Sequence, residues 1–123
     1  MLIPTVALYL ARLIASMAVI TGPLWFVKQN MAFQIFGLPK VIASQQMAAL
    51  GPAIGGRNMS LGILIILASY YLTYRQTGVA LALIATGSGW SDTEVCLRFG
   101  KGHKRHLGNL FFCYGVSAVL LLS

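Results

Sequence analysis

Hydrophobic positions fall into four long runs along the chain, separated by short stretches with basic and turn-forming residues. A helix that crosses a bilayer needs about 20 mainly apolar residues, and each run approaches or exceeds that length. The pattern therefore predicts an all-α fold, a four-helix transmembrane bundle that forms a single integral membrane domain. The predicted spans cover residues 5–27, 44–74, 78–98 and 106–122.

The connection between the first two runs has an amphipathic segment of its own. Apolar Met31, Phe33 and Phe36 are interspersed there with polar side chains such as Gln34. Such a segment is typical of a short helix that lies along the membrane interface. We expect residues 37–39, Gly-Leu-Pro, to end it, because proline disfavours a helical conformation at the residue before it.

Composition supports a membrane protein. Of the 123 residues, 58% are hydrophobic and only 9% are charged. A soluble domain carries about 25% charged residues, so this chain cannot cover a water-facing surface, and we expect the lipid bilayer as its surroundings. The net charge of +7 could suggest nucleic acid, but the basic residues lie mainly between the apolar runs, as membrane orientation requires. We therefore expect no nucleic-acid partner.

The same basic residues predict how the chain is oriented. The first and third connections carry Lys28, Lys40, Arg98, Lys101, Lys104 and Arg105. The second connection carries only Arg75. Because basic loops tend to stay in the cytoplasm, we expect the first and third loops to be cytoplasmic and both termini to be lumenal. The expected membrane is that of the endoplasmic reticulum.

The second run contains two polar residues, Arg57 and Asn58, among apolar and glycine residues. A guanidinium at the centre of a spanning helix costs roughly 2.5–3.5 kcal/mol, so such a group usually faces protein or a wet cavity. Gly51 and Gly55 form a small-residue face that lets another helix approach closely, and a homodimer could use it. Pro52 is expected to bend this long helix.

The third run becomes polar from residue 86 to residue 94. Lipid cannot satisfy these groups, so this half is expected to pack against protein or to line a cavity. At 1.5 Å per residue, Arg57 and Asp92 lie roughly 27 Å and 21 Å from the lumenal ends of their helices. These depths predict that the two side chains come within hydrogen-bonding reach, beside a cavity. The glycines expected to leave room for it are Gly55, Gly56, Gly87 and Gly89.

An aspartate and an arginine that meet within apolar, membrane-spanning segments suggest acid–base chemistry. Asp92 would shuttle a proton or activate a water, while Arg57 and Asn58 orient it and stabilise developing oxyanion charge. His106 enters the same half of the bundle and is a candidate proton relay. The alternatives are a purely structural ion pair between Arg57 and Asp92, and a His106 that faces lipid phosphate.

Three further residues are candidates for substrate binding. Asn109 lies one turn into the fourth run, and Trp90 lies in the polar half of the third. Arg12 could join them only if the first helix lies deep; otherwise it extends to the nearer interface. Glu94 and Arg98 are expected to form an ordinary pair four residues apart on one helix.

The sequence contains no spacing of histidine and cysteine that is typical of a metal site. We therefore expect neither a metal nor another cofactor. Cys96 and Cys113 lie in or beside apolar runs, and we interpret them as packing residues rather than as a disulfide.

Several short motifs resemble one family. They are residues 36–39 (Phe-Gly-Leu-Pro), residues 56–58 (Gly-Arg-Asn) with Leu61 and Gly62, then Asp92, Gly100 and His106. The pattern resembles a fungal domain-of-unknown-function family of small four-span membrane proteins, which often belong to secondary-metabolite gene clusters. The resemblance covers residues 36–108 and implies a place in such a pathway.

Two functions from different classes follow. The first is a membrane-embedded enzyme of secondary-metabolite biosynthesis that performs cofactor-free acid–base chemistry on a lipophilic substrate. Isomerisation, cyclisation and epoxide opening or hydrolysis all fit an Asp–Arg–Asn site. The second is a non-catalytic protein, either a scaffold for partner biosynthetic enzymes or a component of a small-molecule carrier. The family's cluster context favours the enzyme, by analogy.

Overall fold

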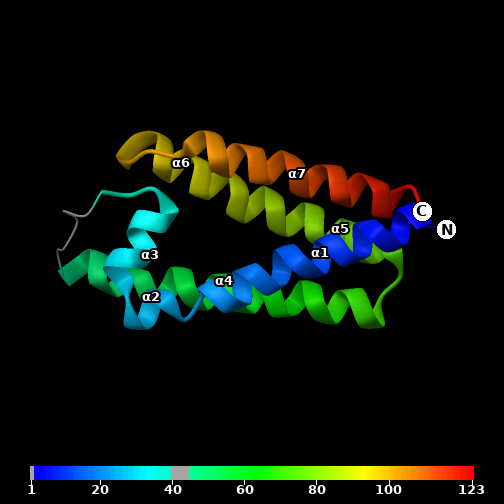
Figure 1. Ribbon diagram of the computed structural model, residues 1–123, viewed down its shortest axis with the longest axis horizontal. Helices are drawn as coiled ribbons and strands as arrows, with labels where there is room; N and C mark the ends of the chain where they lie inside the picture. Colours follow the sequence, from blue (N-terminus) through cyan, green and yellow to red (C-terminus); the bar gives the residue numbers. More distant parts are fainter. Residues whose placement is uncertain (1, 40–44) are drawn as a thin grey trace.

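The computed structural model describes residues 2–39 and 45–123, and this part of the chain is helical and contains no strand. The elements are α1 (Leu2–Thr21), α2 (Leu24–Val27), α3 (Gln29–Phe36), α4 (Gln45–Tyr71), α5 (Tyr74–Ile84), the π-helical turn η1 (Ala85–Gly89), α6 (Trp90–Phe99) and α7 (His103–Leu121) (Figure 1). The predicted all-α class is confirmed. Two residues that the predictions use lie outside the described residues: Lys40, a basic residue of the first connection, and Ser44, the predicted start of the second span.

The long helices run side by side as rods. α5, η1 and α6 follow one another without a break, so together with α1, α4 and α7 they build an elongated bundle (Figure 1). Both termini lie at one end of it, and α3 and the α6–α7 turn lie at the other. Two segments, Leu2–Val27 and Ala49–Tyr71, are long and apolar enough to cross a membrane.

Helix boundaries differ from the predicted spans at three places. α1 ends at Thr21, and a turn at Gly22 and Pro23 separates it from α2. α4 ends at Tyr71, and α5 begins at Tyr74 rather than near residue 78. The early start has a local cause: Thr73 and Gln76 form a capping box, in which each side chain accepts a hydrogen bond from the other residue's backbone N–H. α7 begins at His103, three residues before the predicted span.

Two hydrophobic cores lie along the bundle. The first, nearer the termini, contains alanines spaced four apart on α1 with side chains of α4, α5 and α7: Ala7, Ala11, Ala15, Ile65, Leu81, Val116 and Leu120. The second gathers aromatic residues at the opposite end: Trp25, Ala32, Phe33, Phe36, Leu38 and Cys96. The two cores therefore hold the two ends of the bundle.

Glycines of α4 allow α1 and α2 to approach closely. A Cβ atom added at Gly55 would lie 2.6 Å from the Gly22 carbonyl oxygen, and one at Gly62 would lie 2.6 Å from the Ala15 carbonyl oxygen. A Cβ at Gly51 would lie 3.1 Å from the Trp25 carbonyl oxygen. The predicted small-residue face is therefore confirmed. It is covered within the chain, so a homodimer would need another surface.

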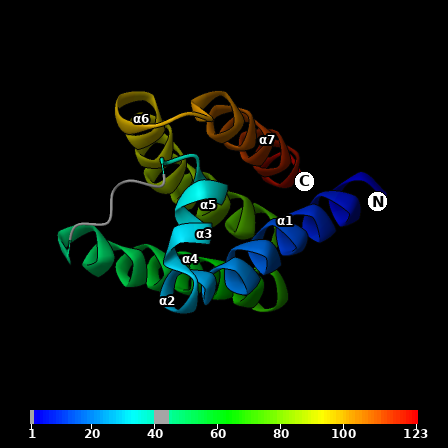
Figure 2. The same cartoon turned by 60° about the vertical axis from the view of Figure 1, so that its left-hand side comes forward.

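The predicted amphipathic segment is the helix α3, and its apolar face covers the bundle. Phe33 and Phe36 are buried, and their rings meet the Trp25 ring edge-on at centroid distances of 5.2 Å and 5.6 Å. Figure 2 shows α3 lying across the end of the bundle, between α4 and α6. The apolar face of α3 therefore packs on protein, while Met31 and Ile35 stay exposed, and its position along the membrane interface stays a prediction.

Glycines also join the end of α3 to the α6–α7 turn. As expected, the helix ends at Gly37, whose φ of 110° is in the left-handed region that favours glycine. The Gly37 carbonyl oxygen accepts a 2.7 Å hydrogen bond from the Lys101 N–H. Added Cβ atoms at Gly37 and Gly100 would collide with the Lys101 and Gly37 carbonyl oxygens, respectively. The two loops are therefore locked together.

Replacing Gly37 with alanine is expected to destabilise the protein more than the same change at Gly102. Both glycines have positive φ, so each substitution adds left-handed strain of about 1–2 kcal/mol. Only Gly37 has backbone in the path of the new Cβ, whereas the nearest atom at Gly102 is 3.8 Å away. Melting temperatures of the two variants in detergent check this, and an equal loss would contradict it.

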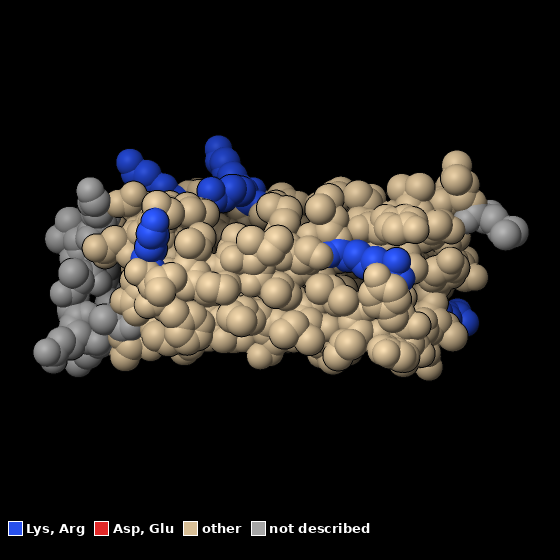
Figure 3. Space-filling view, turned by 60° about the horizontal axis from the view of Figure 1, so that its bottom comes forward, with Lys and Arg blue, Asp and Glu red and all other residues tan. Residues whose placement is uncertain are grey.

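Basic side chains are unevenly distributed. On the face drawn in Figure 3, most Lys and Arg side chains lie toward the end of the bundle opposite the termini. This end includes the turns around Lys28 and Lys101. The helix α3 and the α6–α7 turn therefore lie at the same end of the bundle, while the side of the membrane that this end faces stays a prediction.

Candidate functional site

The centre of the site is the predicted contact between α4 and α6. Arg57 Nη2 lies 2.8 Å from Asp92 Oδ1, which confirms that the two side chains meet. Their side chains are 33% and 18% exposed, so water partly reaches the arginine while the carboxylate is more enclosed. Arg57 Nη1 also donates to Ser91 Oγ at 3.5 Å, which adds a second, weaker link to α6.

Asn58 is held by the same guanidinium. Arg57 Nε and Nη2 donate to Asn58 Oδ1 at 3.2 Å and 3.1 Å, so Nη2 contacts both the amide and the carboxylate. These bonds use the oxygen of the amide and one oxygen of the carboxylate. Among the described residues, Asn58 Nδ2 and Asp92 Oδ2 have no hydrogen-bond partner. One donor and one acceptor are therefore available to a ligand.

Asn58 and Asp92 line a cavity of about 430 Å³ between the two cores. Small-molecule sites are typically cavities of about 300–1,000 Å³ with a few convergent polar groups, and this one has that character. Its apolar wall includes Ile14, Trp25 and Phe36. Its polar wall includes Asn58, Ser88, Asp92, Arg105, His106 and Asn109. The predicted cavity beside the ion pair is confirmed.

The π-helical turn places the polar half of the third run on this wall. Ala85, Ser88, Gly89 and Asp92 line the cavity from one face of η1 and α6. A π-helical turn inside a longer helix often occurs at a functional site. The expectation that this polar stretch lines a cavity is confirmed. Its hydroxyl groups also donate to backbone carbonyls: Ser88 Oγ donates to the Ile84 oxygen at 2.7 Å.

His106 fixes α7 to the end of α3. Its Nε2 lies 2.7 Å from the Phe36 carbonyl oxygen, and its ring centroid is 4.6 Å from that of Phe36. Because a carbonyl oxygen can only accept, Nε2 carries the proton of this bond. The same oxygen accepts from Cys96 Sγ at 3.3 Å. His106 lines the cavity, but its hydrogen bond goes to α3 and not to Asp92.

Arg105 and Cys113 also line the cavity and were not among the sequence candidates. The Arg105 guanidinium donates to the Ile35 carbonyl oxygen, which holds it against α3. A periodic signal exists: Arg105, Asn109 and Cys113 are spaced four apart and so share one face of α7. Interpreting Arg105 only as an orientation charge hid that pattern.

Two predicted substrate-binding residues lie outside the cavity. Arg12 donates from Nε to Ser69 Oγ at 2.9 Å and from Nη2 to the Ser69 carbonyl oxygen at 3.1 Å. Its guanidinium carbon is 4.0 Å from the Tyr70 ring centroid, in a cation–π contact that joins α1 to the end of α4. Trp90 Nε1 donates to Tyr114 Oη at 3.2 Å, and neither ring lines the cavity. Both placements correct the sequence interpretation.

The glycines expected to leave room for the cavity do so at one position only. Gly89 lines it, and an added Cβ there would lie 2.8 Å from a Leu110 side-chain atom. Gly55 packs against α1 and α2, while Gly56 and Gly87 have no neighbour within 4 Å of an added Cβ. The cavity wall is therefore formed mainly by residues other than glycine, including Ala32, Ile35 and Phe36 of α3. The predicted pair of Glu94 and Arg98 is confirmed, at 2.5 Å.

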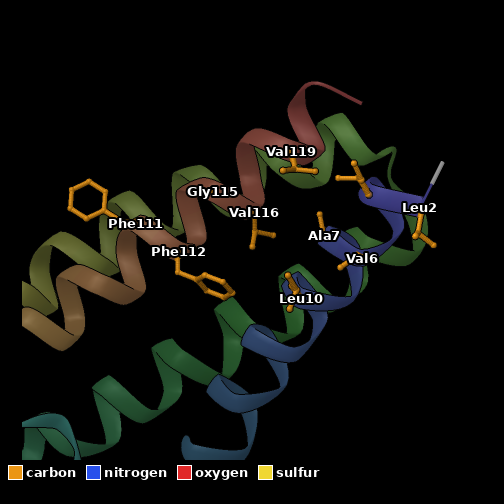
Figure 4. A pocket seen from close by; sticks show the side chains of 10 residues that line it. Leu2, Val6, Ala7, Leu10, Phe111, Phe112, Gly115, Val116 and Val119 are labelled. Atoms are coloured by element: carbon orange, nitrogen blue, oxygen red, sulfur yellow. The ribbon is translucent and has the colours of Figure 1, made fainter.

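A second hollow, near the termini, has no polar side chain. It measures about 480 Å³ and lies between α1 and α7, where Val6, Leu10, Phe112 and Val119 border it (Figure 4). This apolar groove, named here the α1–α7 groove, offers contact but no acid or base. Among the described residues, no three His, Cys, Asp or Glu side chains are grouped to hold a metal ion.

The fold and site define a small all-helical protein with two membrane-length apolar helices and an Asp–Arg–Asn cluster on a cavity wall. The sequence matches the family described as "Domain of unknown function (DUF4267)" over residues 15–122, and the chain belongs to that family. The match includes every residue of the cluster. No curated protein and no solved structure matches the chain.

Proposed function

We propose that the chain is an integral membrane protein in which all four rods cross the bilayer. Two rods have the required length and apolar composition. The other two rods carry some of their polar side chains on the cavity wall or against a neighbouring helix, such as Asp92 and Ser117, while Leu83, Leu97, Phe111 and Phe112 are exposed on the outside. A surface of this kind suits lipid. We place the protein in the endoplasmic reticulum of a fungus, with both termini lumenal.

Topology is testable with two exposed basic residues at opposite ends. Introduced cysteines, Arg75→Cys and Lys101→Cys, are expected to react with an impermeant thiol reagent from opposite sides of sealed vesicles. Tags on both termini should be accessible from the same side as residue 75, because the termini and the α4–α5 turn share one end (Figure 1). Termini on opposite sides would contradict four spans.

The proposed activity is cofactor-free acid–base catalysis on a lipophilic substrate. One observation carries it: Arg57 holds Asp92 and Asn58 together on the cavity wall and leaves Asp92 Oδ2 and Asn58 Nδ2 available. A carboxylate oxygen can accept a proton, and a fixed amide N–H can stabilise the oxygen on which charge develops. The arginine beside them holds the carboxylate in position.

A reaction of this type needs no added reagent. For epoxide opening, Asp92 Oδ2 takes the proton of a hydroxyl or water as that oxygen attacks an epoxide carbon. The carbon–oxygen bond of the ring breaks, and the released oxygen accepts a hydrogen bond from Asn58 Nδ2. This alkoxide oxygen then takes from Asp92 the proton that the attacking hydroxyl or water gave up. Isomerisation uses the same base to remove a proton from one position and return it to another.

The product mass tests this proposal. Deletion of the gene should cause one lipophilic compound to accumulate. Membranes that contain the protein should convert that compound to a product of equal mass, or of mass greater by one water, without added cofactor. A product that differs by two hydrogens, one oxygen atom or a methyl group would contradict acid–base chemistry. A polyketide or terpene synthase gene beside this one would support a secondary-metabolite pathway.

A second candidate function has its own observation. α4 and α6 have few other contacts, so the Arg57–Asp92 pair is a main link between them. A purely structural pair would suit a scaffold for partner enzymes or a small-molecule carrier, in which the cavity binds without chemistry. Turnover by the purified protein separates the two, because a scaffold or carrier would leave the bound compound unchanged.

A further inference from the structure

A smaller cavity adjoins the polar one on the side of the first core. It measures about 120 Å³. Six residues line both cavities, so the two share a wall: Ile14, Ala18, Asn58, Ala85, Ser88 and Cys113. Beyond this shared wall the smaller cavity, named here the inner cavity, is lined by Ala15, Leu61, Gly62, Ile65, Leu81 and Ile84.

The chemistry changes along the bundle axis. Charged and amide groups lie at the α3 end of the polar cavity, including Asp92, Arg105 and Asn109. The inner cavity has no charged group on its wall, and only Asn58 and Ser88 at its border are strongly polar. An apolar cavity of roughly 150 Å³ stays dry and accepts a group the size of benzene. The inner cavity is of comparable size, so it fits an apolar group rather than ordered water.

The direction and length of this space are set by the helices. Asn58 and Ile65 both line the inner cavity from α4, and seven residues of helix correspond to about 10 Å. Ser88 and Leu81 line it from the opposite rod, again seven residues apart. The space is therefore narrow and extends away from Asp92 toward the termini.

We propose that the ligand is an elongated amphipathic molecule with a hydroxyl at one end and one narrow apolar arm at the other. The hydroxyl donates to Asp92 Oδ2 and accepts from Asn58 Nδ2, which are the two atoms left without a described partner. The arm, about one aromatic ring in cross-section and about 10 Å long, occupies the inner cavity. The inference rests on the proposed function, since it names the substrate class of that site.

Cys113 provides a direct readout because it lines both cavities. An occupant should shield its thiol, so the protein in lipid nanodiscs is alkylated with N-ethylmaleimide, and the Cys113 peptide is followed by mass spectrometry. Three probes are compared: phenylpropanol, propylbenzene without the hydroxyl, and a propanol joined to the central ring of anthracene, whose two outer rings make it wider than one aromatic ring. Phenylpropanol is expected to slow labelling at a concentration at least about tenfold lower than propylbenzene, and the anthracene compound is expected to give no protection.

Two variants locate the bound probe. Leu61→Phe narrows the inner cavity and should remove protection, whereas Gly115→Leu fills the α1–α7 groove and should leave it unchanged. An added Cβ at Gly115 meets nothing within 4 Å, so this control should fold. Should Leu61→Phe not fold, the wild-type comparison of the three probes decides alone.

Any of the following outcomes would overturn the inference: no protection by phenylpropanol, equal protection by propylbenzene, protection by the anthracene compound, protection retained in a folded Leu61→Phe variant, or loss of protection in Gly115→Leu. The readout is binding and not turnover. Protection without any turnover would leave the inference standing and remove the proposed enzyme. Turnover of a native substrate without protection by phenylpropanol would overturn the inference and leave the proposed enzyme standing.

Discussion

Replacing Asp92 with asparagine is expected to lower turnover by about 100-fold or more while the protein still folds, because general acid–base groups typically contribute at least this much. The amide keeps the shape of the carboxylate and one oxygen that can accept from Arg57 Nη2. It loses the oxygen that takes up a proton. The rate of product formation in membranes, measured together with the melting temperature of the purified variant, checks this.

Glu94 supplies the matched control. It lies two residues further on α6, is exposed, and pairs only with Arg98 among the described residues. Glu94→Gln removes a carboxylate from the same helix without touching the cavity wall, so turnover should stay within about twofold. An Asp92→Asn variant that melts much earlier and remains active per folded molecule would identify the Arg57 pair as structural. That result would rule out Asp92 as the base of the proposed reaction.

Replacing Gly55 with leucine is expected to destabilise the bundle by about 3 kcal/mol or more, because overpacking against backbone cannot relax easily. The new Cβ would lie 2.6 Å from the Gly22 carbonyl oxygen and 2.7 Å from the Trp25 Cβ. It would push the turn between α1 and α2 away from α4, and Trp25 belongs to the second core. The melting temperature in detergent measures the loss.

Gly56 is the control for this change. It is the next residue on α4, yet an added Cβ there meets nothing within 4 Å. Gly56→Leu should leave the melting temperature unchanged or raise it, since leucine is a better helix former than glycine by up to about 1 kcal/mol. Equal losses at the two positions would show that the close contact of α4 with α1 and α2 does not stabilise the bundle.

The ion pair was predictable because a charged side chain within an apolar segment long enough to span a membrane must face protein or water rather than lipid. Arg57 and Asp92 are opposite charges in neighbouring runs, and simple helical rise places them at similar depth. Arg12 was not predictable in this way. Its partners are the hydroxyl and the carbonyl oxygen of Ser69 and the ring of Tyr70. None of these groups is charged, so the distribution of charges in the sequence does not indicate them.

Other features depend on tertiary packing. The amphipathic pattern of α3 does not show which surface its apolar face covers, and the contacts with Trp25 show that this face packs on protein. The capping box at Thr73 and Gln76 was readable from the sequence and would have placed the start of α5 correctly. Cavities are gaps between helices, so their size follows from helix divergence and has no local sequence signal.

The most direct test of the central claim is turnover by the purified protein alone. The chain in lipid nanodiscs, without partner proteins or added cofactor, is incubated with the compound that accumulates in the deletion strain. We predict conversion to a product of equal mass or of mass greater by one water, and no conversion by Asp92→Asn. A folded wild-type protein that binds this compound but leaves it unchanged would contradict an acid–base enzyme at Asp92, Arg57 and Asn58.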